Sequence, residues 1–184
     1  NENGTISYFG SSYMHQYSFI HALHAAIRLQ KVLANDTTLA FRIGDAISTT
    51  LDDLIKKGVD NIMMNMKRTS NNQNMIYSLY VLSLQGDHHS FVWQIIDILV
   101  KKMRFNNMYG QDIGWLLSTM ARLSTKESSF QFKALVVVKS LVSIINNRMI
   151  QTTRNAYFAE TYTRQRWAST FASNTRTTAL ILEG

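Results

Sequence analysis

Two histidines with helical spacing are the first residues that could do chemistry. His21 and His24 lie three positions apart, so a helix would present both on one face, a spacing suited to two metal ligands. His15 precedes them in the same stretch. Residues 17–33 contain no Asp or Glu that could complete a metal site. We therefore expect packing or surface histidines here, and no metal ligand.

A pair of acids offers a second candidate. Asp52 and Asp53 are neighbours in the chain, and neighbours on a helix point about 100° apart, so they are poorly placed to share a proton. Lys56 and Lys57 follow one turn later. This pattern is typical of a solvated, charged helix face.

Nucleophilic and acid–base catalysis find little support. His88 and His89 open a predicted helix, where we expect solvated side chains rather than a catalytic base. The chain has no cysteine and no G-x-S-x-G turn around a serine. We therefore expect no catalytic residue, no cofactor, and no enzyme activity from this chain.

The chain is moderately basic, with 19 Lys and Arg against 12 Asp and Glu and a net charge of +7. Arginines and aromatics alternate near its C-terminal end, at Arg148, Arg154, Tyr157, Phe158, Tyr162, Arg164, Arg166, Trp167 and Arg176. Stacking on bases with phosphate pairing is one interpretation. The other is aromatics that pack on helices beside solvated arginines. We favour the second because the charge is spread rather than clustered.

The composition indicates a folded chain of helices. Its 184 residues are 46% apolar, which suffices for a buried core. The absence of proline suits long helices, and the absence of cysteine excludes a disulfide scaffold and a thiolate metal site. No stretch of about 18 apolar residues could cross a membrane. The chain starts at Asn1 without a visible signal peptide, and we interpret it as a segment of a longer protein.

The apolar spacing predicts helices and no strands. We expect helices over 17–33, 39–66, 75–84, 89–103, 112–123 and 130–150, and a last one near Ser173. Asn35-Asp36-Thr37 should hold a stop followed by the N-cap of the second helix, and Gly58 should divide that helix into two pieces. Gly86 should be a left-handed cap, followed by Asp87 as the next N-cap. Tyr77, Tyr80, Met63, Met64 and Met66 are expected in the core.

The predicted fold is therefore all-α, with paired antiparallel helices packed side by side. Several phrases also resemble, in order, the thioester-type helical domain of bacterial alpha-2-macroglobulins. Three matching segments are the helix at Tyr17–Leu33, the Lys-Gly-hydrophobic step in Leu54–Ile62 and the helix at Gly110–Leu123. Gly4–Gly10 resembles G-G-F-x-Y-W-x-G, Ile76–Gly86 resembles A-Y-A-L-Y-V-L-A-x-x-G, and Trp167–Leu182 resembles a tryptophan followed by S-x-x-R-x-T-A-L-x-L.

This resemblance covers nearly the whole chain, so residues 1–184 would be one partial domain. It implies an incomplete α/α toroid of inner and outer helices. The parent would trap proteases and protect the cell envelope of a bacterium, in the periplasm. Its partners would be proteases and neighbouring macroglobulin-type domains, and not nucleic acid.

The chain departs from the family at its reactive element, because it has no cysteine for a Cys-x-Glu-Gln thioester. The resemblance therefore implies a scaffold with no reactive atom. Tyr8, Phe9 and Tyr13 could shield a thioester from water elsewhere in the parent. Arg176 would fix a helix start by bonding loop carbonyls.

Two other functions remain open. One is an enzyme on a helical toroid, of the terpene-cyclase or prenyltransferase type, which would need an acidic cluster or zinc ligands that the chain does not show. The other is a helical module that binds RNA or an acidic partner.

Overall fold

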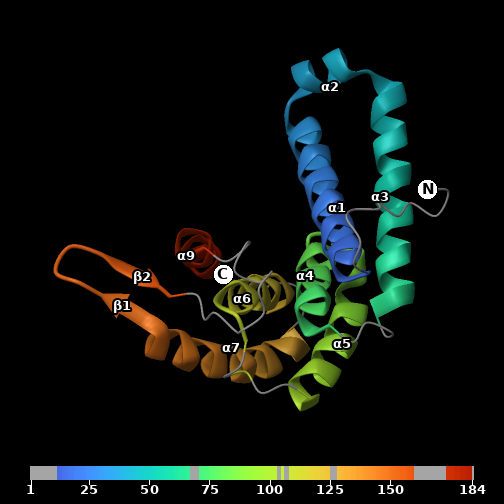
Figure 1. Ribbon diagram of the computed structural model, residues 1–184. Coiled ribbons are helices and arrows are strands. Elements are labelled where there is room, and N and C mark those ends of the chain that lie inside the picture. The colour runs from blue at the N-terminus through green and yellow to red at the C-terminus, as the bar shows by residue number, and fades with distance from the viewer. Residues whose placement is uncertain are drawn as a thin grey trace. The chain divides into compact units, whose positions relative to one another are not determined.

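The computed structural model describes residues 12–66, 71–102, 105, 108–124, 128–159 and 173–183. These residues are mostly helical, which confirms the all-α class (Figure 1). The chain divides into two compact units, residues 1–84 and residues 85–184. Each unit has its own packed elements and is described by itself.

The described part of the first unit consists of four helices. These are α1 (Ser12–Asn35), α2 (Thr37–Ile43), α3 (Asp45–Met66) and α4 (Asn72–Ser83). Helix α1 packs on both α3 and α4, and short α2 bridges the ends of α1 and α3 (Figure 1). The core of the unit is made by apolar side chains at three- and four-residue steps, among them Ile20, Leu23, Ile27, Ile55, Val59, Ile62, Ile76 and Leu79.

The break in the second predicted helix was placed at the wrong glycine. The helix ends at Gly44, whose φ of 83° is in the region that favours glycine and whose N–H donates to the Ala40 carbonyl at 3.0 Å. Gly58 instead lies buried inside α3. A Cβ atom there would lie 2.8 Å from Leu23 Cδ1, so Gly58 allows α1 and α3 to approach closely.

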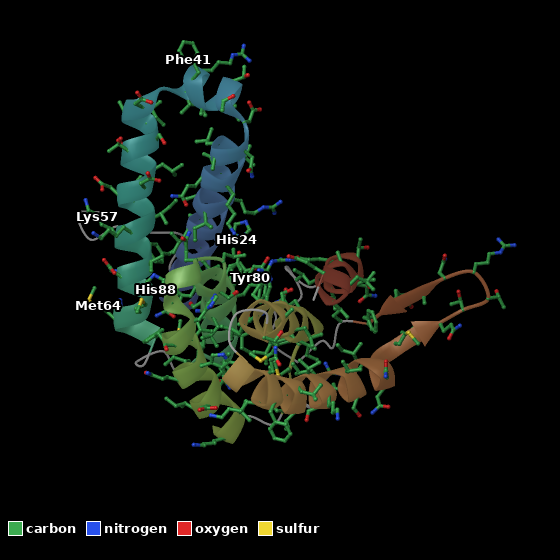
Figure 2. All side chains as sticks on the ribbon, turned by 180° about the vertical axis from the view of Figure 1, so that it is seen from behind. His24, Phe41, Lys57, Met64, Tyr80 and His88 are labelled. Atoms are coloured by element: carbon green, nitrogen blue, oxygen red, sulfur yellow. The ribbon has the colours of Figure 1, made fainter. Side chains whose placement is uncertain are left out.

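Side-chain caps begin two of these helices. The Asp36 carboxylate accepts a hydrogen bond from the Leu39 N–H at 2.9 Å, which confirms the predicted cap of α2. Asn71 caps α4 in the same way through the Asn74 N–H, at 3.1 Å. Helix α2 has no buried residue, and its Phe41 is 87% exposed and projects from the end of the unit (Figure 2).

The second unit begins with the 3₁₀ turn η1 (Gly86–His88) and α5 (His89–Lys102). Helices α6 (Gly110–Ser124), α7 (Ser128–Arg148) and α9 (Asn174–Glu183) follow, with strands β1 (Met149–Gln151) and β2 (Ala156–Phe158) between the last two. Helix α6 packs on both α7 and α9, and β2 lies against α9 (Figure 1).

The turn before α5 differs from the prediction at Gly86. Gly44 is the only glycine with a positive φ in the described ranges, so Gly86 is not a left-handed cap. It starts a 3₁₀ turn that also contains Asp87, and α5 begins at His89. Residues of a 3₁₀ turn have negative φ angles, so Gly86 does not take the left-handed conformation.

The predicted absence of strands was wrong for a short hairpin. The helix expected to reach residue 150 ends at Arg148, and β1 pairs antiparallel with β2, with Ile150 opposite Tyr157. Thr152 closes the turn, because its hydroxyl accepts from the Asn155 N–H at 3.0 Å. The Phe158 N–H donates to Thr178 Oγ1 of α9 at 3.0 Å, which anchors β2. Strands of three residues are too short to give a period-two signal.

Candidate functional site

A cluster of histidine and tyrosine side chains in the described part of the first unit surrounds the Tyr77 hydroxyl. His21 Nδ1 lies 2.9 Å and His24 Nδ1 lies 3.1 Å from Tyr77 Oη. A phenol has one proton to donate, so it donates to one imidazole and accepts from the other. The second imidazole must carry its proton on Nδ1. The three groups therefore satisfy one another in a chain of two hydrogen bonds.

Aromatic rings hold both imidazoles in place. Tyr17 stacks on His21, with centroids 6.3 Å apart and planes 6° from parallel. Tyr80 meets His24 edge to face, with centroids 5.3 Å apart and an angle of 89°. Figure 2 labels His24 of α1 and Tyr80 of α4 close to one another. Pairs of aromatic rings contribute about 0.5–1.5 kcal/mol each beyond burial, so the rings restrict the orientations of both histidines.

Helical spacing on two helices builds this cluster. His21 and His24 lie three residues apart on α1, and Tyr77 and Tyr80 lie three apart on α4, so each pair shares one helix face. The side chain of Asn74 donates to Gln16 Oε1 at 3.1 Å, one further link between α4 and α1. Tyr77 is 1% exposed, whereas His21 is exposed and His24 half-buried. The cluster therefore has a buried phenol and a face open to solvent.

Sequence reasoning found part of this cluster. It placed His21 and His24 on one face and expected packing or surface histidines, and both contact neighbouring side chains while His21 is also exposed. It treated Tyr77 only as a core residue and missed its hydroxyl as the partner of both histidines. The matching three-residue spacing of the two pairs was the available signal. No group of three or more His, Asp or Glu side chains that could hold a metal ion occurs within the described ranges.

The other candidate acids and histidines lie elsewhere. Asp52 and Asp53 are exposed, as expected, and Asp52 Oδ1 accepts from the Gln30 side chain at 2.7 Å. The expectation that His89 is solvated was wrong, because it is 8% exposed. His89 lies three and four residues before Val92 and Trp93, so it shares their buried face of α5.

The arginines in the described part of the C-terminal stretch contact the chain itself or solvent. Arg148 Nη1 donates to the Met108 carbonyl at 2.6 Å. The Arg176 guanidinium lies 5.7 Å from the centre of the Trp115 ring, a cation–π distance. Arg154 is exposed in the hairpin turn. The predicted positions Tyr162, Arg164, Arg166 and Trp167 lie outside the described residues, as do Tyr8, Phe9 and the side chain of Tyr13.

Ser173 caps the start of α9. Ser173 Oγ accepts from the Arg176 N–H at 3.3 Å, while the guanidinium of Arg176 covers Trp115. One turn further along, Leu180 lies against Gly114 of α6, where a Cβ atom would be 2.7 Å from Leu180 Cβ and 2.8 Å from its backbone carbon. Gly114 therefore permits the close contact between α6 and α9.

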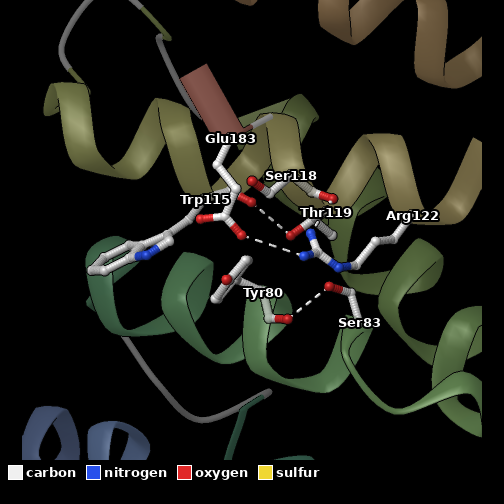
Figure 3. A network of polar contacts seen from close by, with 7 residues as sticks. All are labelled: Tyr80, Ser83, Trp115, Ser118, Thr119, Arg122 and Glu183. Atoms are coloured by element: carbon white, nitrogen blue, oxygen red, sulfur yellow. Dashed lines mark hydrogen bonds and ion pairs between the residues drawn. The ribbon is translucent and has the colours of Figure 1, made fainter. Parts of the chain in front are cut away.

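Polar contacts along α6 are of a structural kind. Arg122 donates to the Ser118 carbonyl at 3.0 Å and pairs with Glu183 of α9 at 3.4 Å (Figure 3). Thr119 Oγ1 donates to the Trp115 carbonyl one turn earlier. In the first unit, Ser83 Oγ likewise donates to the Tyr80 carbonyl at 2.6 Å (Figure 3). The Thr119 and Ser83 bonds satisfy hydroxyl groups within helices, and the Arg122 contacts hold its side chain along α6 and beside α9, so we assign none of them a chemical role.

None of the helices in the described part of the chain is long and apolar enough to cross a membrane. A comparison of the whole chain with protein-family models, curated protein sequences and solved structures finds no match.

Proposed function

We propose that this chain is a helical scaffold segment of a bacterial alpha-2-macroglobulin-like protein, which traps proteases and protects the cell envelope. The proposal rests on the sequence phrases that resemble this family. It is supported by the packing of two of those phrases, Ile76–Gly86 and the described part of Trp167–Leu182.

The first phrase contains a helix buried on every side. In α4, Asn74 and all residues from Ile76 to Ser83 are buried. In α6, which belongs to another matched segment, Gly110 to Met120 and Leu123 are buried. A helix buried all round is surrounded by other elements, as an inner helix of a layered array would be.

Two long helices have the character of outer helices. The buried residues of α3 form one stripe, made by Ile55, Gly58, Val59, Ile62 and Met66. The buried residues of α7 also form one stripe, made by Ala134, Val137, Leu141 and Ile145. Buried inner and half-exposed outer helices are the two layers that an α/α toroid of antiparallel pairs would need. This contrast supports the proposed toroid.

The second phrase lies where α9 packs on α6, and this is the observation that carries the proposal. Three markers of the phrase have a packing partner: Arg176 covers Trp115, Thr178 accepts from the Phe158 N–H, and Leu180 touches Gly114. Thr177 of the same helix is buried. A scaffold needs side chains that hold its helices together, and these contacts do so without any reactive group.

The outer face of α7 offers a surface for neighbouring domains of the parent. Phe132, Leu135 and Val136 are exposed on it, with Val142 one to two turns further along. An apolar row of this kind on a helix surface is typical of a contact region. We assign it to a neighbouring macroglobulin-type domain of the same parent chain.

The proposal is tested on the full-length gene product with a protease and two substrates. Entrapment predicts that cleavage of a large protein substrate falls while cleavage of a short chromogenic peptide persists, because a cage excludes only large molecules. Unchanged cleavage of the protein substrate would reject the proposal, and so would equal loss of both activities.

A matched pair of variants links the assay to this segment. Thr177→Asp places a charge at a buried position of α9, whereas Ala179→Asp places it at an exposed position of the same helix. We expect the first variant to lose protection of the protein substrate and the second to keep it. Equal behaviour of the two variants would show that the packing of α9 does not matter for trapping.

A further inference from the structure

We propose that helices α1 and α3 carry a self-association surface, through which two copies of the chain form a symmetric dimer. In this dimer α1 of one copy faces α3 of the other, so the two helix pairs make a four-helix bundle. The proposal does not depend on the scaffold function proposed above.

Each of the two helices has an apolar row outside its buried stripe. The row of α1 consists of Ala22, Ala25, Leu29 and Val32, and the row of α3 consists of Ile47, Leu51 and Leu54. Leu29 and Val32 are 42% and 50% exposed, and Ile47 and Leu54 are 59% and 56% exposed. Alternating steps of three and four residues are typical of the seam by which one helix packs on another. The rows thus have the spacing of a helix contact, yet these four side chains lie open to solvent.

The two rows lie on the same side of the helix pair. Two contacts show how the helices face one another: Gln30 of α1 donates to Asp52 of α3 at 2.7 Å, and Leu23 lies against Gly58. At about 100° per residue, Leu29 and Leu54 each lie roughly a quarter turn from the line that joins the two helices, toward the same side. His24, which bonds Tyr77 of α4, lies roughly a quarter turn toward the other side. The rows therefore form one face, opposite to α4.

Charge favours a second copy over an anionic lipid surface as the occupant of this face. Neither row contains a charged residue. Residues 28–54 contain three Lys and Arg against four Asp, a net charge of −1, whereas the whole chain has a net charge of +7. Two copies therefore repel one another least where the helix pair carries its rows. Anionic lipids would be attracted to the more basic remainder of the chain.

The charges beside the rows favour α1 facing α3 of the partner. Helix α1 contains Arg28 and Lys31 and no carboxylate. The first half of α3 contains three carboxylates before its first lysine, at Asp45, Asp52 and Asp53. Opposite charges meet when α1 of one copy lies on α3 of the other, and like charges meet when α1 lies on α1. Such complementarity selects the orientation of a contact more than its strength.

The size of the face indicates a reversible dimer. Residues 22–33 and 47–58 each rise about 18 Å along their helices, and two helices side by side are about 22 Å wide. The contact would therefore cover about 400 Å² on each copy, or about 800 Å² in total. Interfaces of this size are typical of weak, transient complexes. We expect the dimer to form at high protein concentration and to dissociate on dilution.

Sedimentation velocity of the intact chain over a range of concentrations tests the proposal. The mass should rise from 21.1 kDa toward twice that value as the concentration approaches about 1 mM. Leu54→Asp should raise the Kd of the dimer about tenfold or more, because a symmetric contact contains the change twice. Leu54 is exposed, so the fold should survive, and circular dichroism checks the helices.

Met64→Asp is the matched control. Met64 is an exposed apolar residue of the same helix, and Figure 2 shows it pointing away from α1. This variant should form the dimer as the unaltered chain does. A monomer at every concentration, or equal dimerisation of Leu54→Asp and Met64→Asp, would overturn the proposal. Binding of a monomer to phosphatidylcholine vesicles, lost in Leu54→Asp, would assign the face to lipid and would also overturn it.

Disulfide formation tests which helices meet. The chain has no cysteine, so an introduced thiol can react only with another introduced thiol. An equimolar mixture of Leu29→Cys and Leu54→Cys chains should form a disulfide-linked dimer faster than either variant alone. Faster dimer formation by Leu29→Cys alone would contradict the pairing of α1 with α3.

Discussion

Replacing Gly114 with alanine should destabilise the second unit. The added Cβ atom would lie 2.7 Å from Leu180 Cβ, 2.8 Å from the Leu180 carbonyl carbon and 2.9 Å from its oxygen. Two of these three atoms belong to the backbone of α9, so a rotation of one side chain cannot relieve the contact. Helix α9 would have to move away from α6, and the Arg176 contact with Trp115 would weaken with it.

The magnitude follows from two opposing effects. Overpacking of a tight contact costs about 1–3 kcal/mol. Alanine favours the helix over glycine by about 1 kcal/mol in a helix interior. The net change in the free energy of unfolding should therefore be a loss of up to about 2 kcal/mol.

Gly58→Ala is the matched control. Gly58 is also buried in a helix, but its nearest contact would be Leu23 Cδ1 at 2.8 Å, the end of a flexible side chain. Rotation of Leu23 relieves this contact and the same gain in helix propensity applies, so this variant should be more stable by about 1 kcal/mol. The two variants should thus differ by about 1–3 kcal/mol.

Urea unfolding followed by circular dichroism measures both variants, and amide hydrogen exchange assigns each change to its unit. The exchange data are needed because two units do not guarantee a single transition. Equal stability of the two variants, or a more stable Gly114→Ala protein, would refute the argument that α6 and α9 meet at Gly114.

Three smaller changes test other contacts. Asp36→Ala removes the cap of α2, which should cost about 1 kcal/mol and speed amide exchange over residues 37–43; unchanged exchange would contradict the cap. Thr178→Val removes the acceptor of the Phe158 N–H and should lower the free energy of unfolding by about 1 kcal/mol. The Phe158 amide should then exchange faster, and unchanged slow exchange would contradict the bond. Arg148→Met keeps the apolar stem but loses the bond to the Met108 carbonyl. It should lower the free energy of unfolding by about 1–2 kcal/mol, seen as a lower urea midpoint. An unchanged midpoint would show that the bond is not formed in solution.

Local sequence signals predicted most of the helices and one cap. The positions of the helices were predicted from apolar residues at three- and four-residue steps. The start of α2 was predicted from the capping residue type at Asp36. The glycines show where local signals stop being sufficient. Gly44 and Gly58 are the same residue type in similar helical surroundings, yet one ends a helix and the other lies under Leu23. Gly58 is buried against Leu23 of α1, and a contact with another helix cannot be predicted from the local sequence around the glycine.

The candidate cluster and the hairpin depended on contacts between distant residues. Tyr77 and His21 are separated by 56 positions, and only the packing of α4 on α1 brings the hydroxyl to the imidazole. Each strand of the hairpin has three residues, and an N–H bond to Thr178 on α9 holds β2. His89 was misjudged because its place at a helix start outweighed its spacing to Val92.

The protease assay on the parent protein with the two glycine variants tests the central claim most directly. The account predicts that the unaltered parent and its Gly58→Ala variant protect a large protein substrate but leave a short peptide open to cleavage. The Gly114→Ala variant should lose part of that protection, because the packing of α9 on α6 is weakened. A parent that never protects the protein substrate would contradict the proposed scaffold of a protease trap.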